Sequence, residues 1–181
     1  MIVVPEAARP YLAMQRPGVA DYGASIAEDF EMLRPYLPGH TGAILDIGCG
    51  VAGIDALLYR HYGGCRIHLI DGTGTGSGRY GFRERMEPYN SMAATREMLE
   101  ANGVEPSDII EGAPDKARLV LSLMSWGFHY PVSTYLKTVE DCLDGVLVVD
   151  VRHGREQLDE KFGQPQVVAT MTRSQRLCYV R

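Results

Sequence analysis

Residues 44–53 have the sequence ILDIGCGVAG, and the prediction of the fold starts from them. The apolar run that ends at Ile47 predicts a buried strand, and apolar residues recur at helical spacing between Ile54 and Tyr62. Glycine has no Cβ, so the backbone between the two elements can turn tightly and approach a ligand closely. A helix after such a turn presents free N–H groups and its positive dipole end to that ligand.

A carboxylate ends the next apolar run of the chain. Asp71 follows a predicted strand over residues 66–70 and lies 18 positions after Gly53 (71 − 53). An acid about 20 residues after the last glycine of such a turn is the residue type that hydrogen-bonds the ribose of a nucleoside cofactor. The turn and the acid together predict a nucleoside-cofactor site.

Two cofactors fit this pattern. The spacing Gly48-x-Gly50-x-x-Gly53 matches the dinucleotide fingerprint, so NAD is one of them. The run Leu45-Asp46-Ile47-Gly48-Cys49-Gly50 resembles motif I of class I S-adenosylmethionine-dependent methyltransferases, in which an acid stands two places before the first glycine. Dinucleotide folds usually carry an apolar residue there. S-adenosylmethionine has no diphosphate, and carboxylates suit its sulfonium and ammonium. We therefore favour it over NAD, and over a glycine turn that binds no ligand.

The order of the predicted elements gives the fold class. Strands alternate with helices, which predicts an α/β, Rossmann-like, doubly wound domain. The resemblance covers residues 40–181 and implies a mostly parallel seven-stranded sheet with a C-terminal antiparallel hairpin. Strands are predicted over residues 43–47, 66–70, 108–110, 117–124, 145–151, 167–172 and 176–180, and helices over residues 21–37, 52–62, 91–102, 132–142 and 155–162.

Two segments are predicted to lie outside this regular pattern. An N-terminal arm and helix are expected over residues 1–40, before the methyltransferase domain at 41–181, and residues 1–20 show little periodicity and predict an extended arm. Residues 72–90 predict a long glycine-rich loop. A loop of this length is either a flexible surface loop or a lid over the site, and the sequence leaves both open.

The resemblance assigns cofactor contacts residue by residue. It implies that the glycine loop faces the methionine part of the cofactor and that Asp71 accepts both ribose hydroxyls, since a carboxylate can accept two charge-assisted bonds. Gly72 is expected beside the adenosine, and Glu111 near the adenine amine. The full set of predicted cofactor residues is Asp46, Gly48, Cys49, Gly50, Gly53, Asp71, Gly72, Glu111 and Ser125.

The segment 122–131, SLMSWGFHYP, holds the only tryptophan, two further aromatic residues and a histidine. Ligands of open α/β sheets bind beyond the carboxyl ends of the strands, so this segment is predicted to meet the acceptor. We nominate His129 as a general base, Tyr130 as a positioning group and His153 as the alternative base. The competing interpretation is that these side chains only pack the loop or lie in solvent. The segment is not the Asn-Pro-Pro-Tyr type of motif found in amino-directed nucleic-acid methyltransferases.

The charge of the chain bears on the acceptor. At 181 residues the net charge is −5, which argues against a broad nucleic-acid footprint. We therefore expect methyl transfer to a small molecule, at a hydroxyl of a sugar or secondary metabolite. The alternatives are methylation of a protein or nucleic acid and a non-catalytic cofactor-binding partner subunit, and a homodimer is left open. A local basic groove would draw on Arg79, Arg83, Arg85, Arg152 and Arg155.

The remaining patterns concern location and metals. No apolar run approaches the ~20 residues that span a bilayer, and no signal-peptide pattern is present, which predicts a cytoplasmic protein. No two of the four cysteines form a CxxC pair, so we expect free thiols and no metal site. These cysteines are Cys49, Cys65, Cys142 and Cys178.

Overall fold

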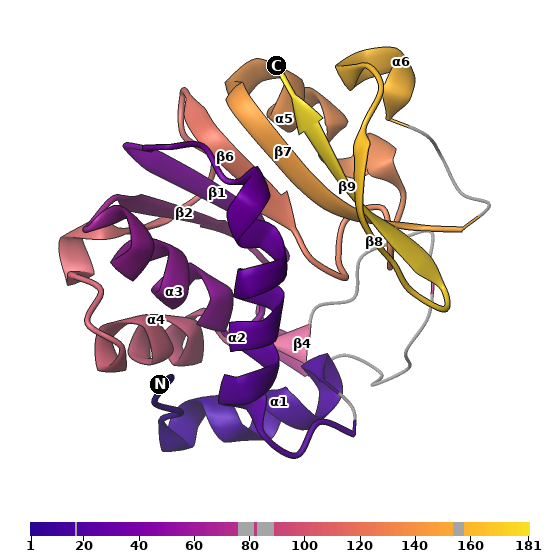
Figure 1. Cartoon of the computed structure of the whole chain (residues 1–181). Coiled ribbons are helices and arrows are strands. Elements are labelled where there is room, and N and C mark those ends of the chain that lie inside the picture. The colour runs from indigo at the N-terminus through magenta and orange to yellow at the C-terminus, as the bar shows by residue number, and fades with distance from the viewer. Residues whose placement is uncertain (17, 76–81, 83–88, 154–157) are drawn as a thin grey trace.

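The computed structural model describes residues 1–16, 18–75, 82, 89–153 and 158–181, with a seven-stranded sheet at its centre (Figure 1). The strand order is β5-β2-β1-β6-β7-β9-β8. Neighbouring strands from β5 to β7 are parallel, and β9 is antiparallel to both β7 and β8. The strands are β1 (Ala43–Ile47), β2 (Arg66–Ile70), β5 (Ile109–Glu111), β6 (Ala117–Ser122), β7 (Leu143–Arg152), β8 (Gln166–Thr170) and β9 (Ser174–Val180).

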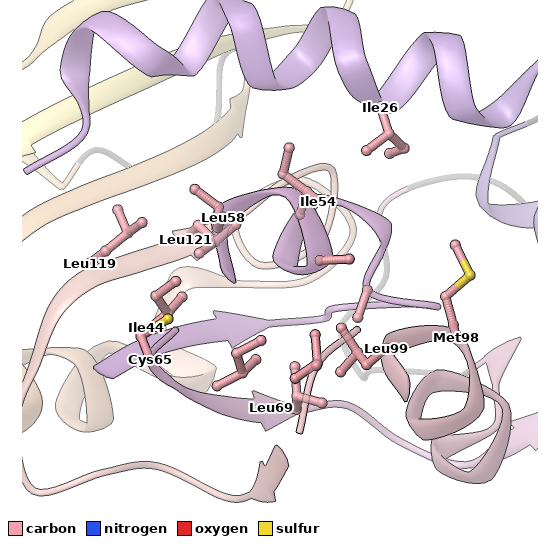
Figure 2. Close-up of a cluster of buried hydrophobic side chains, with 14 of the residues drawn as sticks. Ile26, Ile44, Ile54, Leu58, Cys65, Leu69, Met98, Leu99, Leu119 and Leu121 are labelled. Atoms are coloured by element: carbon pink, nitrogen blue, oxygen red, sulfur yellow. The ribbon is translucent and has the colours of Figure 1, made fainter. Parts of the chain in front are cut away.

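Helices cover both faces of this sheet. Side chains of α2, α3 and α4 pack on one face, against strand residues such as Ile44 and Leu121 (Figure 2). Leu45 and Ile47 point to the other face, toward α5 and the segment after β6. All five residues of β1 are buried, as in a central parallel strand. The helices are η1 (Glu6–Ala8), α1 (Arg9–Gln15), α2 (Tyr22–Leu33), η2 (Arg34–Tyr36), α3 (Gly53–Tyr62), α4 (Met92–Ala101), η3 (Pro106–Asp108), η4 (Val132–Thr134), α5 (Leu136–Cys142) and α6 (Asp159–Phe162).

The predicted fold class is confirmed by this arrangement. A doubly wound, mostly parallel seven-stranded sheet closes with an antiparallel hairpin of β8 and β9. Parallel strands joined through helices place the carboxyl ends of β1, β2 and β6 at one edge of the sheet, and ligands of open α/β sheets bind beyond that edge. The loops that follow these three strands therefore form the candidate site.

The N-terminal segment differs from its prediction. Residues 1–20 are predicted to be extended, but η1 and α1 occupy much of this stretch. Pro10 lies in the first turn of α1, where a missing N–H removes no helical hydrogen bond. The segment folds back on the domain because the Asn102 side chain accepts from the Val3 N–H at 2.9 Å and donates to the Val3 carbonyl at 2.7 Å.

Several element boundaries also differ. The strand predicted to reach residue 124 ends at Ser122, because Met124 has a φ of 54°. The helix predicted from residue 132 begins as the short η4 and becomes α5 at Leu136. The helix predicted over residues 155–162 is represented by α6 (Asp159–Phe162), and residues 155–157 lie outside the described residues. In the predicted loop 72–90, β3 (Gly74–Thr75) pairs with β4 (Tyr89–Asn90), while residues 76–81 and 83–88 lie outside the described residues.

A buried ion-pair network joins the C-terminal hairpin to the N-terminal helices. The Arg176 guanidinium donates to both oxygens of Asp150, at 2.8 and 3.0 Å, and to Asp29 Oδ1 at 2.7 Å. Arg16 Nη2 lies 2.6 Å from Asp29 Oδ2. Arg176 is 2% exposed and Asp150 is fully buried, so each charge depends on its partner for solvation.

Removing Arg176 should therefore destabilise the protein strongly. Arg176→Met leaves two buried carboxylates without their main counter-charge, and we expect the free energy of unfolding to fall by about 3–5 kcal/mol. Urea denaturation measures this, with Arg173→Met as the control because Arg173 is exposed in the turn between β8 and β9. Equal stability of the two variants would contradict a structural role for the network.

Candidate functional site

The loop after β1 is built on glycine. Gly48 and Gly50 have φ values of 74° and 54°, a region that other residues rarely adopt. The Gly48 N–H donates to the Ile70 carbonyl at 2.6 Å, which ties the start of this loop to the end of β2. The loop then enters α3 at Gly53. The strand, turn and helix predicted from residues 44–62 are all present.

Three side chains from three other elements fill the space that a Cβ would take on these glycines. A Cβ on Gly48 would collide with the Ser125 hydroxyl, and one on Gly50 with the Gln15 amide. At Gly53, a Cβ would collide with the Tyr22 ring. The glycine loop is thus the point where the N-terminal helices and the segment after β6 meet the end of β1.

Asp71 lies at the end of β2 and faces the same loop. Its Oδ2 accepts from the Gly50 N–H at 2.8 Å and from Asn90 Nδ2 at 3.1 Å, and its Oδ1 accepts from the Gly72 N–H at 2.7 Å. Burial raises the pKa of this carboxyl to about 6, against the lowering effect of these hydrogen bonds. A carboxylate offers about four acceptor positions, and the hydrogen bonds from the described residues leave one of them open, on Oδ1.

Two polar side chains donate hydrogen bonds to the carbonyl of Gly50 in the same loop. Asn90 Nδ2 and Thr95 Oγ1 each donate to it at 2.7 Å, from β4 and α4. Both side chains are buried. They hold the peptide between Gly50 and Val51, whose N–H donates to Gln15, while the preceding peptide presents the Gly50 N–H to Asp71, so the described residues fix both peptides of the loop.

Asp46 and Asp55 form a buried acidic pair beneath the loop, one from β1 and the other from the first turn of α3. Neither oxygen of Asp55, nor Oδ1 of Asp46, accepts a hydrogen bond from the described residues. Burial raises the pKa of both carboxyls, and the Asp55 charge raises that of Asp46 further. Two carboxyls so placed cannot both ionise readily, so we infer that the pair holds a proton at neutral pH.

The segment after β6 lies against the glycine loop through two hydroxyls. Ser125 Oγ and Tyr130 OH are 2.9 Å apart, and Ser125 is the residue in contact with Gly48. The Met124 N–H donates to Asp150 Oδ2 at 3.0 Å, which holds the start of this segment to the ion-pair network. Trp126 is fully buried and donates its indole N–H to the Val132 carbonyl at 2.7 Å, which favours a packing role.

The two histidines nominated as bases have different surroundings. His129 is half-buried, with its ring edge-on to Phe128 at 4.7 Å between centroids. His153 is exposed, and its Nε2 lies 3.0 Å from the Met171 carbonyl beside the C-terminal hairpin. Arg152 donates to the Phe128 carbonyl at 3.0 Å and stacks over that ring.

The remaining predicted cofactor residues lie around the same edge of the sheet. Cys49 is half-buried, its Sγ is 4.0 Å from Asp71 Oδ2, and burial raises the pKa of its thiol, which favours the neutral form. Gly72 donates to Asp71, as described above. Glu111 is exposed at the end of β5, next to β2.

Sequence reasoning missed several residues that shape the loop. Most of their contacts with the loop join residues far apart in the chain. Only Asp55, two residues after the last glycine of the motif, could have been found from its position in the sequence. The Val51 N–H donates to Gln15 Oε1 at 3.1 Å, across 36 positions. The missed residues are Gln15, Tyr22, Asp55, Asn90 and Thr95.

Two searches bear on metals and membranes. Among the described residues, no group of three or more histidine, cysteine, aspartate or glutamate side chains is arranged to hold a metal ion. Within the same residues, no helix combines the length and the apolar character needed to cross a bilayer.

Comparison with known proteins places the chain in a family. No protein-family model matches it. Ribosomal RNA small subunit methyltransferase C of Pseudomonas putida F1 is 30% identical over 139 residues, which are 74% of this chain and 36% of that protein. A candidate O-methyltransferase of Nostoc punctiforme has a TM-score of 0.64 at 12% identity, covering 97% of this chain and 60% of its own. Magnesium protoporphyrin IX methyltransferase of Synechocystis, solved with bound S-adenosylmethionine, has a TM-score of 0.57 at 13% identity, covering 98% and 92%.

The chain belongs to the class I S-adenosylmethionine-dependent methyltransferase family, as the resemblance in motif I predicts. The strand order, the glycine loop after β1 and the acid after β2 agree with that assignment. The chain spans about a third of the length of the curated relatives that it matches.

The acidic pair makes a prediction about pH and stability. Because the pKa of Asp55 is raised in the folded state, ionising it costs folding free energy, and stability should fall as pH rises from about 4 to 8. Asparagine is neutral, and its amide oxygen can accept from protonated Asp46 as the Asp55 carboxylate does, so we expect Asp55→Asn to raise the free energy of unfolding at pH 8 by about 2 kcal/mol.

Denaturant unfolding at pH 5 and pH 8 measures this effect. Asp144→Asn is the matched control, because Asp144 is exposed on β7. A gain that is the same at both pH values, or that the control reproduces, would contradict the buried-proton interpretation.

Proposed function

We propose that the chain binds S-adenosylmethionine at the loop after β1 and transfers its methyl group to an acceptor. The observation that carries this proposal is the Asp71 carboxylate, which the Gly50 and Gly72 N–H groups hold at the carboxyl end of β2. The acceptor position on Oδ1 that the described residues leave open suits a ribose hydroxyl. A bidentate contact with both hydroxyls would require Asn90 to release Oδ2.

The charge of the site supports the same cofactor. Asp46, Asp55 and Asp71 surround the glycine loop, and no ion pair to any of the three is found among the described residues. Three buried oxygens of the acidic pair accept no hydrogen bond from any other described residue, which favours a ligand that carries positive charge. A diphosphate would face these acids directly, so NAD fits less well. When bound, S-adenosylmethionine supplies an electrophilic methyl group on a sulfonium.

Binding of S-adenosylhomocysteine tests the cofactor proposal. By calorimetry, we expect low-micromolar affinity for the protein and at least a tenfold loss in Asp71→Asn, which keeps the shape of the side chain but not its charge. Asp115→Asn is the control, because Asp115 is exposed before β6.

The pH dependence of this affinity has a definite sign. The pKa of Asp71 is about 6, and its ionised form is the better acceptor, so affinity should weaken by up to about tenfold per pH unit below 6. Asp71→Asn should flatten this dependence. Tight binding of NADH with none of S-adenosylhomocysteine would instead support a dehydrogenase.

For the acceptor, we propose a hydroxyl of a small molecule, such as a sugar or a secondary metabolite. The segment that supports this is Ser125–Pro131, which lacks the Asn-Pro-Pro-Tyr type of motif and provides one half-buried histidine. Transfer to a hydroxyl forms the oxygen–methyl bond, breaks the sulfur–methyl bond and releases the hydroxyl proton. His129 would take that proton, while Ser125 and Tyr130, joined by a hydrogen bond, would position the acceptor.

A second candidate acceptor is ribosomal RNA. The identity of 30% to a ribosomal RNA methyltransferase favours it, so the net charge alone is a weak argument against nucleic acid. Of the arginines that would form a basic groove, Arg152 donates to the Phe128 carbonyl and stacks on the Phe128 ring. The other four arginines lie outside the residues that the structure describes: Arg79, Arg83, Arg85 and Arg155.

Product detection with labelled S-adenosylmethionine separates the acceptors. Sugars and phenols are tested against small-subunit ribosomal RNA, and methylation of the small molecules alone is expected. With the acceptor found, His129→Gln should lower kcat by about 100-fold or more and leave cofactor affinity unchanged. His153→Gln is the matched control and should keep near-normal kcat. Labelled RNA would overturn the small-molecule proposal, and cofactor binding with no turnover on any acceptor would favour a non-catalytic subunit.

A further inference from the structure

The end of helix α1 contacts the glycine loop directly. Gln15 Oε1 accepts from the Val51 N–H at 3.1 Å, and Gln15 Nε2 lies 3.4 Å from both the Tyr89 carbonyl and Asn90 Oδ1. The absence of a Cβ on Gly50 is what admits the Gln15 amide, since a Cβ there would lie 2.6 Å from Oε1. One side chain thus bridges the cofactor loop and β4.

The rest of the N-terminal segment is fastened at several points. Tyr89 OH donates to the Pro10 carbonyl at 3.2 Å, and the Tyr11 and Tyr89 rings pack edge-to-face at 5.8 Å. At the far end, the Asn102 side chain makes two hydrogen bonds to the backbone of Val3. The segment is therefore docked on the domain and contacts both β4 and the glycine loop.

The residue after Gln15 anchors this helix in the interior. Arg16 pairs with Asp29 at 2.6 Å, and Asp29 pairs in turn with the buried Arg176. Asp29 and Arg176 are both largely inaccessible to solvent, so the electrostatic attraction is weakly screened. Two consecutive residues thus make separate contacts: Gln15 bonds to the glycine loop, and Arg16 pairs with Asp29 of α2.

We propose that Gln15 is a cofactor-binding residue and that Arg16 is its positioning residue, so that α1 forms a clasp over the bound cofactor. The proposal rests on the proposed function. The amide of Gln15 offers both a donor and an acceptor, which matches the ammonium and carboxylate of the amino-acid end of the cofactor. Release of the cofactor then requires the Gln15 contact to open, and the Arg16 ion pair slows that opening.

The contact itself is tested first in the ligand-free protein. Hydrogen exchange of the Val51 amide reports the bond to Gln15, and Gln15→Ala should speed that exchange at least tenfold. Gln15→Glu, which keeps an acceptor oxygen, should restore much of the protection. Unchanged exchange at Val51 in Gln15→Ala would overturn the clasp without reference to any ligand.

Cofactor release is the second test. Stopped-flow displacement of S-adenosylhomocysteine gives the dissociation rate, which Gln15→Ala and Arg16→Ala should each raise about tenfold, with partial recovery in Arg16→Lys. Arg9→Ala is the matched control, because Arg9 lies on the same helix and its only ion pair among the described residues is an exposed one with Glu6. Thermal unfolding of each variant shows whether it is folded. The Gln15 side chain is partly exposed, so Gln15→Ala still tests the clasp if Arg16→Ala does not fold.

The outcomes separate the two proposals. Faster release in Gln15→Ala and Arg16→Ala, with Arg9→Ala unchanged, supports the clasp. Release of S-adenosylhomocysteine from all variants at the rate of the unaltered protein overturns the clasp and leaves the proposed function standing. If the unaltered protein does not bind S-adenosylhomocysteine at all, the proposed function fails, and the clasp fails with it.

Discussion

Close approach to the glycines after β1 is the constraint on which the rest of the site depends. Ser125, Gln15 and Tyr22 occupy the space beside Gly48, Gly50 and Gly53 in turn. A Cβ at any of these positions would force a side chain from a different part of the fold to move: Ser125 after β6, Gln15 of α1 or Tyr22 of α2. The absence of a Cβ therefore lets three separate segments pack against one loop.

Charge is divided between two regions of the buried interior. In the network of Arg176, Asp150 and Asp29, each carboxylate has a guanidinium partner, so the ions compensate one another within the protein. The acids around the glycine loop have no such guanidinium partner among the described residues: N–H groups donate to Asp71, and burial raises the pKa of Asp46 and Asp55. This contrast agrees with the cofactor assignment, because a cationic ligand would compensate the acids at the loop, whereas those of the network already have cationic partners.

Much of the fold followed from local patterns, whereas the walls of the site did not. Periodicity and the glycine turn predicted β1, α3 and the position of Asp71, since each depends on neighbours in sequence. The contacts of Gln15 with Val51 and of Arg176 with Asp29 join residues 36 and 147 positions apart, and no local pattern encodes them. The extended arm was mispredicted for a related reason: α1 has only seven residues, and docking stabilises a helix that short.

The fold of the chain does not determine which acceptor it methylates. The segment after β6 takes its conformation from contacts with other parts of the chain: the Met124 N–H donates to Asp150, and the Trp126 indole N–H donates to the Val132 carbonyl. Asp150 is in turn held by Arg176, so the ion-pair network is joined both to Arg16 at the end of α1 and to the segment after β6. A relative that shares the cofactor loop but not this support can present a different surface to its acceptor. The match to ribosomal RNA methyltransferases therefore constrains the cofactor chemistry more tightly than it constrains the acceptor.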